Sequence, residues 1–79
     1  MKLELFYKNG CGFCASVLNT IQNLKIQDKV QLKNINENIE FEKDLVIESG
    51  DKQVPTLFVD GKPMQESEEI KKFLVQSFM

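Results

Sequence analysis

Apolar residues follow two different periods at the start of the chain. Leu3, Leu5 and Tyr7 alternate with other residues, which is the two-residue period of a β-strand over residues 3–7. From Cys14 onward, apolar residues lie three or four positions apart, which is the spacing of one face of an amphipathic helix. The residues of this face are Cys14, Val17, Leu18, Ile21 and Leu24. The chain therefore begins with a strand that is followed by a helix.

The next apolar run predicts a second strand over residues 30–35, with Val30 and Leu32 on one face. A strand, a helix and a strand of this length form a βαβ unit, in which the two strands are parallel and the crossover is right-handed. The loop between the first strand and the first helix then lies at the carboxyl end of the first strand.

A second helix is predicted to run to Ser49, where Gly50 provides a stop signal. Either Asn36 or Asn38 can cap its start, because a side-chain oxygen there accepts a hydrogen bond from the first helical turn. Its apolar face is broad and contains Ile39, Phe41, Leu45, Val46 and Ile47. This helix therefore also needs an apolar surface to pack against.

A hairpin is predicted in the second half of the chain. Leu57–Val59 has the composition of a buried strand, and Asp60-Gly61 after it is a strong signal for a type I′ turn. Residues 62–65 should return as an antiparallel edge strand, where Pro63 is tolerated because edge amides are unpaired.

The last helix is predicted to begin with Ser67 as its N-cap, followed by Glu68 in the first turn, where a carboxylate suits the helix dipole. Its inward face is formed by Ile70, Phe73, Leu74 and Phe78. The element order is therefore β-α-β-α-β-β-α. We predict an α/β fold in which helices cover both faces of a four-stranded mixed sheet.

The bulk composition limits the classes of protein that need to be considered. With 79 residues, of which 42% are hydrophobic, we expect a single domain over residues 1–79. No stretch approaches the ~20 apolar residues that cross a bilayer, and no apolar leader is evident, so we expect a cytoplasmic protein without a membrane partner. Ten lysines are scattered among twelve acidic residues, for a net charge of −2, which argues against nucleic acid as a partner.

Thiol chemistry must involve Cys11 and Cys14, because they are the only cysteines. The thiolate is the reactive form, and a cysteine in a C-x-x-C motif at a helix N-terminus can have its pKa lowered from ~8.5 to ~3.5–7.5. Cys11 is the candidate nucleophile. Cys14 lies on the apolar helix face, where it is shielded and placed to attack a mixed disulfide formed on Cys11.

Two other interpretations of this cysteine pair carry less weight. A structural zinc site generally needs four ligands, and the chain has no third cysteine and no histidine, so we predict no metal. A structural disulfide across so short a loop constrains the unfolded chain little.

The combination of motifs resembles the glutaredoxins, which are small members of the thioredoxin fold. The resemblance rests on the C-x-x-C after the first strand, on Val54-Pro55 before the third, and on the Asp60-Gly61 hairpin with a polar helix start beyond it. It covers essentially the whole chain. It implies a thioredoxin-like (glutaredoxin) fold and thiol-disulfide exchange linked to glutathione.

The resemblance also implies roles for residues around the cysteines. Pro55 matches a cis-proline of the family that leaves the main chain of the preceding residue, here Val54, free to pair with a bound thiol substrate. Lys8 matches a lysine that helps to hold glutathione and favours the thiolate of the cysteine matching Cys11. Phe13 replaces a common tyrosine and keeps an aromatic wall.

Further glutathione contacts are implied at the start of the last helix and before Val54. Ser67 and Glu68 match the pair that receives the γ-glutamyl end, with amides and a hydroxyl for its carboxylate and an acid for its ammonium group. Lys52 is matched by arginine or lysine in many members and is expected to face a carboxylate.

Two departures from the glutaredoxin pattern concern the glutathione site and the loop. Gln65-Glu66 stands where many members have Gly-Gly, whereas Glu66-Ser67 with Ile70 is similar to a segment of glutathione transferases that grips the same γ-glutamyl group. The loop Cys-Gly-Phe-Cys is one residue away from the Cys-Gly-Phe-Ser of monothiol glutaredoxins, which share a [2Fe-2S] cluster between subunits. The insertion that those members carry before the cysteine is missing here.

The sequence therefore predicts a monomeric, glutathione-linked thiol-disulfide oxidoreductase that reduces protein disulfides and glutathione mixed disulfides, with glutathione as reductant and no tightly bound cofactor. Two alternatives stay open: a carrier of a [2Fe-2S] cluster ligated by Cys11 and glutathione, and a redoxin that is reduced by a flavin-dependent reductase.

Overall fold

The predicted order of elements is confirmed in a computed structural model that describes residues 1–79. A short 3₁₀ helix between α1 and β2 is the only element that the sequence pattern did not predict. The elements are β1 (Leu3–Tyr7), α1 (Gly12–Leu24), the 3₁₀ helix (Gln27–Lys29), β2 (Val30–Asn34), α2 (Ile39–Ser49), β3 (Thr56–Val59), β4 (Lys62–Met64) and α3 (Ser67–Phe78). None of the helices is long and apolar enough to span a bilayer.

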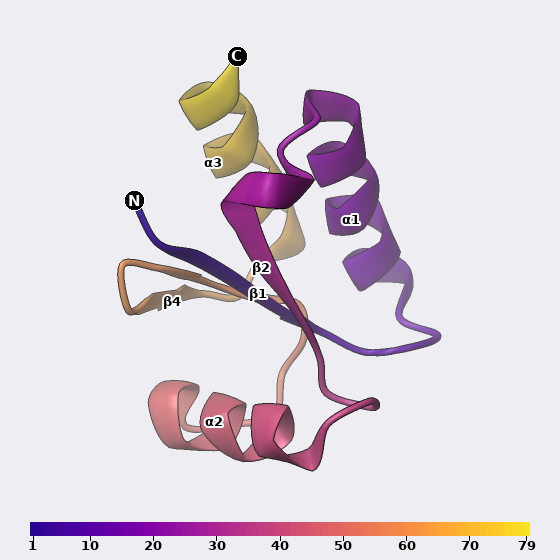
Figure 1. Cartoon of the computed structure of the whole chain (residues 1–79), viewed down its shortest axis with the longest axis vertical. Helices are drawn as coiled ribbons and strands as arrows, with labels where there is room; N and C mark the ends of the chain where they lie inside the picture. The colour runs from indigo at the N-terminus through magenta and orange to yellow at the C-terminus, as the bar shows by residue number, and fades with distance from the viewer.

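The four strands form one mixed sheet in the order β2-β1-β3-β4 (Figure 1). β1 pairs in parallel with β2 and antiparallel with β3, which in turn pairs antiparallel with β4. Helices α1 and α3 lie on one side of this sheet and α2 lies on the other (Figure 1). The architecture is the α/β thioredoxin-like fold that the resemblance implies.

β1 is buried on both faces, so it contributes to two separate cores. Leu3 and Leu5 point toward α1 and α3, while Phe6 belongs to the core on the α2 side. The larger core consists of Leu3, Leu5, Val17, Ile21, Ile26, Val30, Leu57, Ile70 and Leu74. The smaller core consists of Phe6, Ile35, Leu45 and Phe58, with the two phenylalanine rings edge to face at a centroid distance of 5.4 Å.

The apolar face of α2 is narrower than the sequence predicts. Leu45 is fully buried, but Ile39 is 63% exposed and Ile47 is 79% exposed. Only one side of the helix faces the small core, so our prediction of a broad apolar face is wrong at Ile39 and Ile47. Leu32 is also 41% exposed, because β2 is an edge strand with a neighbour on one side only.

Most element boundaries follow the predicted signals. Asn38, one of the two candidate caps, accepts a hydrogen bond from the main-chain N–H of Glu40 at 2.9 Å, and Gly50 ends α2 with a φ of +89°. Asp60 and Gly61 have φ values of +50° and +87°, as a type I′ turn requires.

The predicted start of α3 is wrong by one residue. Glu66 is the N-cap, and Ser67 is the first residue within the helix. No side chain caps this end, so the serine hydroxyl is not committed to the helix. β4 likewise ends at Met64 rather than at Gln65.

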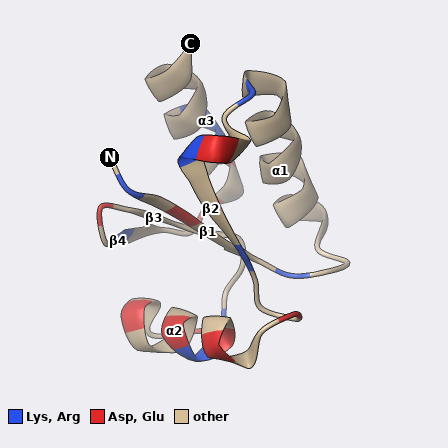
Figure 2. Ribbon diagram, in the orientation of Figure 1, with Lys and Arg blue, Asp and Glu red and all other residues tan.

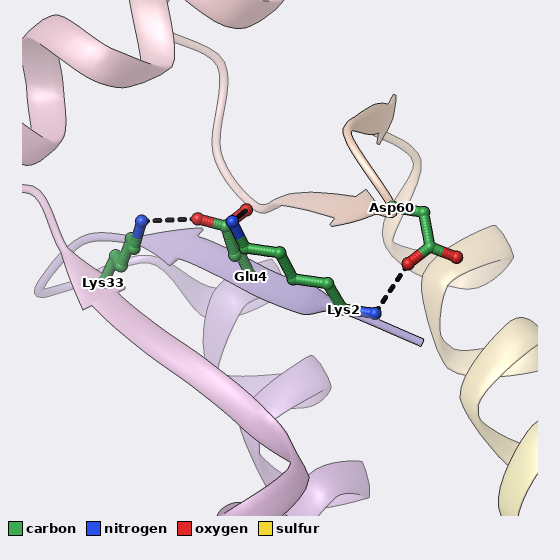
Figure 3. Close-up of polar contacts among 4 residues, drawn as sticks. All are labelled: Lys2, Glu4, Lys33 and Asp60. Atoms are coloured by element: carbon green, nitrogen blue, oxygen red, sulfur yellow. Dashed lines mark hydrogen bonds and ion pairs between the residues drawn. The ribbon is translucent and has the colours of Figure 1, made fainter.

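An ion pair lies within the sheet, on the face that carries α2. Lys33 of β2 donates a hydrogen bond to the Glu4 carboxylate of β1, and both side chains are largely buried (Figure 3). The Lys33 ammonium also lies 5.2 Å from the centroid of the Phe6 ring and 5.7 Å from that of Phe41. By contrast, α2 carries several charged positions (Figure 2), and three of them, Glu40, Lys43 and Glu48, are exposed. Lys33 therefore neutralises a carboxylate that has little access to water.

The N-terminal end of β1 is attached to the hairpin turn. The main-chain N–H of Lys2 donates to the Asp60 carboxylate at 2.7 Å (Figure 3). The Asp60 N–H donates in return to the Lys2 carbonyl at 2.8 Å. These reciprocal bonds extend the pairing of β1 and β3 beyond the strands themselves.

We expect the Lys33→Met substitution to lower the free energy of unfolding by about 2 kcal/mol, because it removes the hydrogen-bonded partner of the largely buried Glu4 carboxylate and leaves only the exposed Lys2 ammonium, 3.7 Å away. Urea unfolding monitored by circular dichroism measures this. The control is Lys43→Met, which removes an exposed pair with Glu40 and should change the free energy by less than about 0.5 kcal/mol. Equal effects of the two substitutions would contradict the prediction.

Candidate functional site

The two cysteines occupy different environments at the start of α1. Cys11 is the N-cap residue, and its sulfur accepts a hydrogen bond from the main-chain N–H of Cys14 at 3.2 Å. Cys11 is partly exposed, whereas Cys14 is completely buried. Both are free thiols. The exposed sulfur therefore lies at the positive end of the helix dipole, where negative charge is favoured.

The Cys14 thiol is held in its protonated form. Its pKa is raised from 9.0 to about 11, chiefly by burial and in addition by a side-chain hydrogen bond with Cys11 and by the negative charge of Cys11. A hydrogen bond from the main chain of Lys8 and the lysine charge act in the opposite direction. At neutral pH, Cys14 is thus a proton-bearing partner beside the exposed sulfur.

A ring of three asparagines fixes the loop that precedes Cys11. Asn34 donates from its side-chain amide to the Asn9 side-chain carbonyl at 2.9 Å, and the Asn9 N–H donates to the Asn36 side chain at 2.8 Å. The Asn36 N–H closes the ring at the Asn34 side chain, also at 2.9 Å. Sequence analysis missed this ring, although parallel strands that end side by side bring such residues together. The ring ties the cysteine loop to the end of β2.

A pocket of about 150 Å³ lies beside the cysteine loop. Its lining residues are Phe13, Gln53, Val54, Pro55, Gln65, Glu66 and Ser67. The Val54–Pro55 peptide bond is cis, and no hydrogen bond within the chain engages the main chain of Val54. Three segments that are far apart in sequence therefore supply one concave surface with a free main-chain segment in its wall.

Five of the predicted glutathione contacts line this pocket: Phe13, Val54, Pro55, Glu66 and Ser67. The other three do not. Lys52 forms an ion pair with Glu42 of α2 at 3.6 Å, and Glu68 forms one with Lys71 at 3.1 Å. Lys8 is exposed in the cysteine loop.

Gln53 and Gln65 also line the pocket, and sequence analysis did not propose either as a contact. Gln53 directly precedes the Val54-Pro55 motif, and Gln65 was noticed only as a departure from glycine. Both glutamines directly precede a predicted contact, Val54 or Glu66, and this adjacency in the sequence could have indicated them.

The family profile named glutaredoxin matches residues 3–64. The chain belongs to the glutaredoxin family. No curated protein sequence matches the chain.

Solved structures agree with this glutaredoxin in fold. A thioredoxin-like protein superposes with a TM-score of 0.76 at 16% identity, over 92% of this chain and 99% of its own. The glutathione transferase Omega 3C from Trametes versicolor gives 0.80 at 22% identity, but this chain covers only 34% of it. A buckwheat glutaredoxin in complex with glutathione gives 0.68 at 21% identity, over 96% of this chain and 74% of its own.

This glutaredoxin is thus a thiol redox protein with a C-x-x-C pair at Cys11 and Cys14. Thiol-disulfide oxidoreductase activity is the general activity of its family.

We expect Cys14 to ionise near pH 11 in the reduced protein, because burial keeps its thiol neutral. In a Cys11→Ala variant its pKa should fall, since the hydrogen bond and charge of Cys11 are removed, yet remain above 9.0 because burial remains. Thiolate absorbance in the ultraviolet, followed against pH, measures both values. Cys14 titrating at or below 9.0 in this variant would contradict the assignment of burial as the main cause.

Proposed function

We propose that this glutaredoxin is a glutathione-linked oxidoreductase that reduces protein disulfides and glutathione mixed disulfides. The observation that carries the proposal is the pair of unequal thiols beside a pocket with a free main-chain segment at Val54. An exposed sulfur can attack a disulfide, while the pocket offers main-chain groups to the peptide that carries it.

The reaction begins when the Cys11 thiolate attacks one sulfur of the substrate disulfide. A bond from Cys11 to that sulfur forms, the substrate S–S bond breaks, and the other sulfur leaves as a thiolate that takes a proton from water. The charge on Cys11 is thereby lost. Because this charge and the Cys11 hydrogen bond both raise the Cys14 pKa, the second thiol becomes easier to deprotonate once the mixed disulfide exists.

The mixed disulfide then has two outcomes. Cys14 can attack the Cys11 sulfur, which releases the substrate as a thiol and leaves a Cys11–Cys14 disulfide. Two molecules of glutathione return this disulfide to the dithiol and are themselves oxidised to glutathione disulfide. Where the substrate carries glutathione, one external glutathione attacks the glutathione sulfur of the mixed disulfide, forms glutathione disulfide and releases the Cys11 thiolate, so Cys14 is not needed.

We propose that glutathione lies in the pocket with its cysteinyl part against the Val54 main chain and Pro55. Phe13 would form one wall, and Glu66 and Ser67 would meet the γ-glutamyl group at the start of α3, where main-chain N–H groups are free.

Three charged residues would complete the proposed glutathione site at its edge. Lys8 is free to approach a carboxylate from the cysteine loop. Lys52 and Glu68 would have to leave their ion pairs with Glu42 and Lys71. Exposed pairs of this kind contribute only ~0–1 kcal/mol, so a ligand can replace them.

Substitution of each cysteine tests the two roles. Cys11→Ser should lower the rate on any disulfide roughly 1,000-fold or more, as loss of a nucleophile does in other enzymes. Cys14→Ser should retain reduction of a glutathione mixed disulfide and lose turnover of a protein disulfide. Steady-state assays with both substrates measure this. Full activity of Cys11→Ser would exclude the mechanism.

The reductant is tested separately by incubating the oxidised protein with mixtures of glutathione and glutathione disulfide. We expect the Cys11–Cys14 disulfide to be reduced, with the ratio of dithiol to disulfide changing tenfold per ~30 mV of glutathione potential. Trapping with a thiol reagent followed by mass spectrometry gives this ratio. A disulfide that resists glutathione but is reduced by a flavin-dependent reductase would contradict the glutathione-linked proposal.

A further inference from the structure

The main chain of Gln53, which directly precedes Val54, is held at both of its polar groups. Its N–H donates to the Asp51 carboxylate at 3.0 Å. Its carbonyl accepts from the hydroxyl of Thr56 at 2.6 Å, and Thr56 is fully buried. By contrast, no hydrogen bond within the chain engages the main chain of Val54. The free segment in the pocket wall therefore follows a main-chain unit whose orientation is fixed on both sides.

The side chain of Gln65 joins the two groups that hold Gln53. Its amide nitrogen donates to the Asp51 carboxylate at 2.9 Å and to the Thr56 hydroxyl at 3.3 Å. The orientation of this amide is unambiguous, because a carboxylate only accepts and the single hydroxyl hydrogen of Thr56 already goes to Gln53. One amide group therefore reaches both main-chain groups of Gln53, each through a single intermediate.

Gln65 belongs to the opposite wall of the pocket, between β4 and α3. The pairing of β3 with β4 stops at Leu57 and Met64, so it does not reach this part of the two walls. A further bond crosses here, from the side-chain amide of Gln53 to the main-chain carbonyl of Gln65 at 3.2 Å. The walls are therefore held together beside the pocket by bonds that involve side chains.

We propose that Gln65 is a positioning residue that makes the pocket selective for disulfides carrying a peptide main chain. By fixing both main-chain groups of Gln53, it keeps the free N–H and carbonyl of Val54 in one orientation, with which an extended peptide can pair. A segment that is ordered in advance loses less conformational freedom when a ligand binds. This inference rests on the proposed reduction of glutathione mixed disulfides and adds the residue that determines the selectivity.

The experiment compares two disulfides, each mixed with reduced protein in the absence of free glutathione. The mixed disulfide of glutathione with β-mercaptoethanol carries a peptide main chain, whereas the disulfide of two β-mercaptoethanol molecules carries none. In both reactions the Cys11 thiolate attacks a disulfide sulfur, and β-mercaptoethanol leaves as a thiolate that takes a proton from water. Acid quenching and mass spectrometry follow the loss of the free Cys11 thiol and give a rate constant for each disulfide.

The ratio of these two rate constants is the peptide preference of the protein. Dithiothreitol, which has no pocket, gives the intrinsic ratio for the same two disulfides. In the wild-type protein the peptide preference should exceed the intrinsic ratio about 10-fold or more, because only the peptide disulfide gains from binding.

Gln65→Ala should reduce the peptide preference about 5- to 10-fold, because the segment before Val54 is no longer ordered in advance. The rate constant for the disulfide without a peptide should stay within about twofold, since that compound has no main chain to pair with Val54. A general loosening of the fold would change both rate constants. The control is Gln76→Ala, which removes an exposed glutamine of α3 that has no side-chain hydrogen bond and does not line the pocket, and should behave as wild type.

An exchange of charge tests the contact between Gln65 and Asp51 directly. Gln65→Glu places a second carboxylate against Asp51 and should reduce the peptide preference at least as far as Gln65→Ala does. Asp51→Asn alone keeps an acceptor oxygen and should change the preference by less than about twofold. Combined with Gln65→Glu, it restores a donor and an acceptor with their places exchanged, so the double variant should recover most of the preference.

The outcomes that overturn the inference are distinct from failure of the proposed function. A wild-type preference that is unchanged in Gln65→Ala would exclude Gln65 as the positioning residue and leave the proposed function intact. A double variant that recovers no preference would overturn the role of the contact with Asp51. If the wild-type preference does not exceed the intrinsic ratio, the proposed glutathione site fails and this inference fails with it.

Discussion

One hydrogen bond, from the main-chain N–H of Cys14 to the Cys11 sulfur, joins helix formation to thiol chemistry in this protein. A helix leaves its first N–H groups without partners, and a side-chain oxygen of serine or aspartate usually accepts one of them. Here a sulfur takes that place. Folding of α1 therefore presents a polarised donor to one thiol and, three residues later, carries the other thiol into the core. The difference between the two sulfurs is a product of the helix itself.

Local signals predicted the fold because they agree with the long-range packing almost everywhere. The Asp60-Gly61 turn and the Gly50 stop depend on main-chain conformations that few other residues adopt, so the sequence specifies them directly. The failures involve position relative to the whole sheet. Leu32 and Ile47 are apolar but exposed. Their exposure was not predicted, because a periodic pattern shows neither which strand lies at the edge of the sheet nor how wide the contact of α2 is.

The candidate site was predictable where main-chain chemistry defines it and not where side chains from distant segments meet. The C-x-x-C motif was evident from its spacing, and the role of Val54-Pro55 followed from the resemblance to the glutaredoxins. The contacts of Gln53 and Gln65 depend on how the loop before β3 lies against the residues that follow β4. Lys52 has a matched position in the sequence, yet its ammonium pairs with Glu42, because α2 presents an acid at that point. No local pattern contains that information.

The ring formed by Asn9, Asn34 and Asn36 supports the reactive loop without any charged group. Its members neither gain nor lose protons across the range in which thiols do, and bonds between neutral amides are little affected by salt. The asparagine ring is therefore expected to keep its conformation while the Cys11 sulfur changes between thiolate, mixed disulfide and disulfide. Because the ring does not respond to pH or ionic strength, changes in these conditions are expected to act on the thiols and not on the conformation of the loop that holds Cys11.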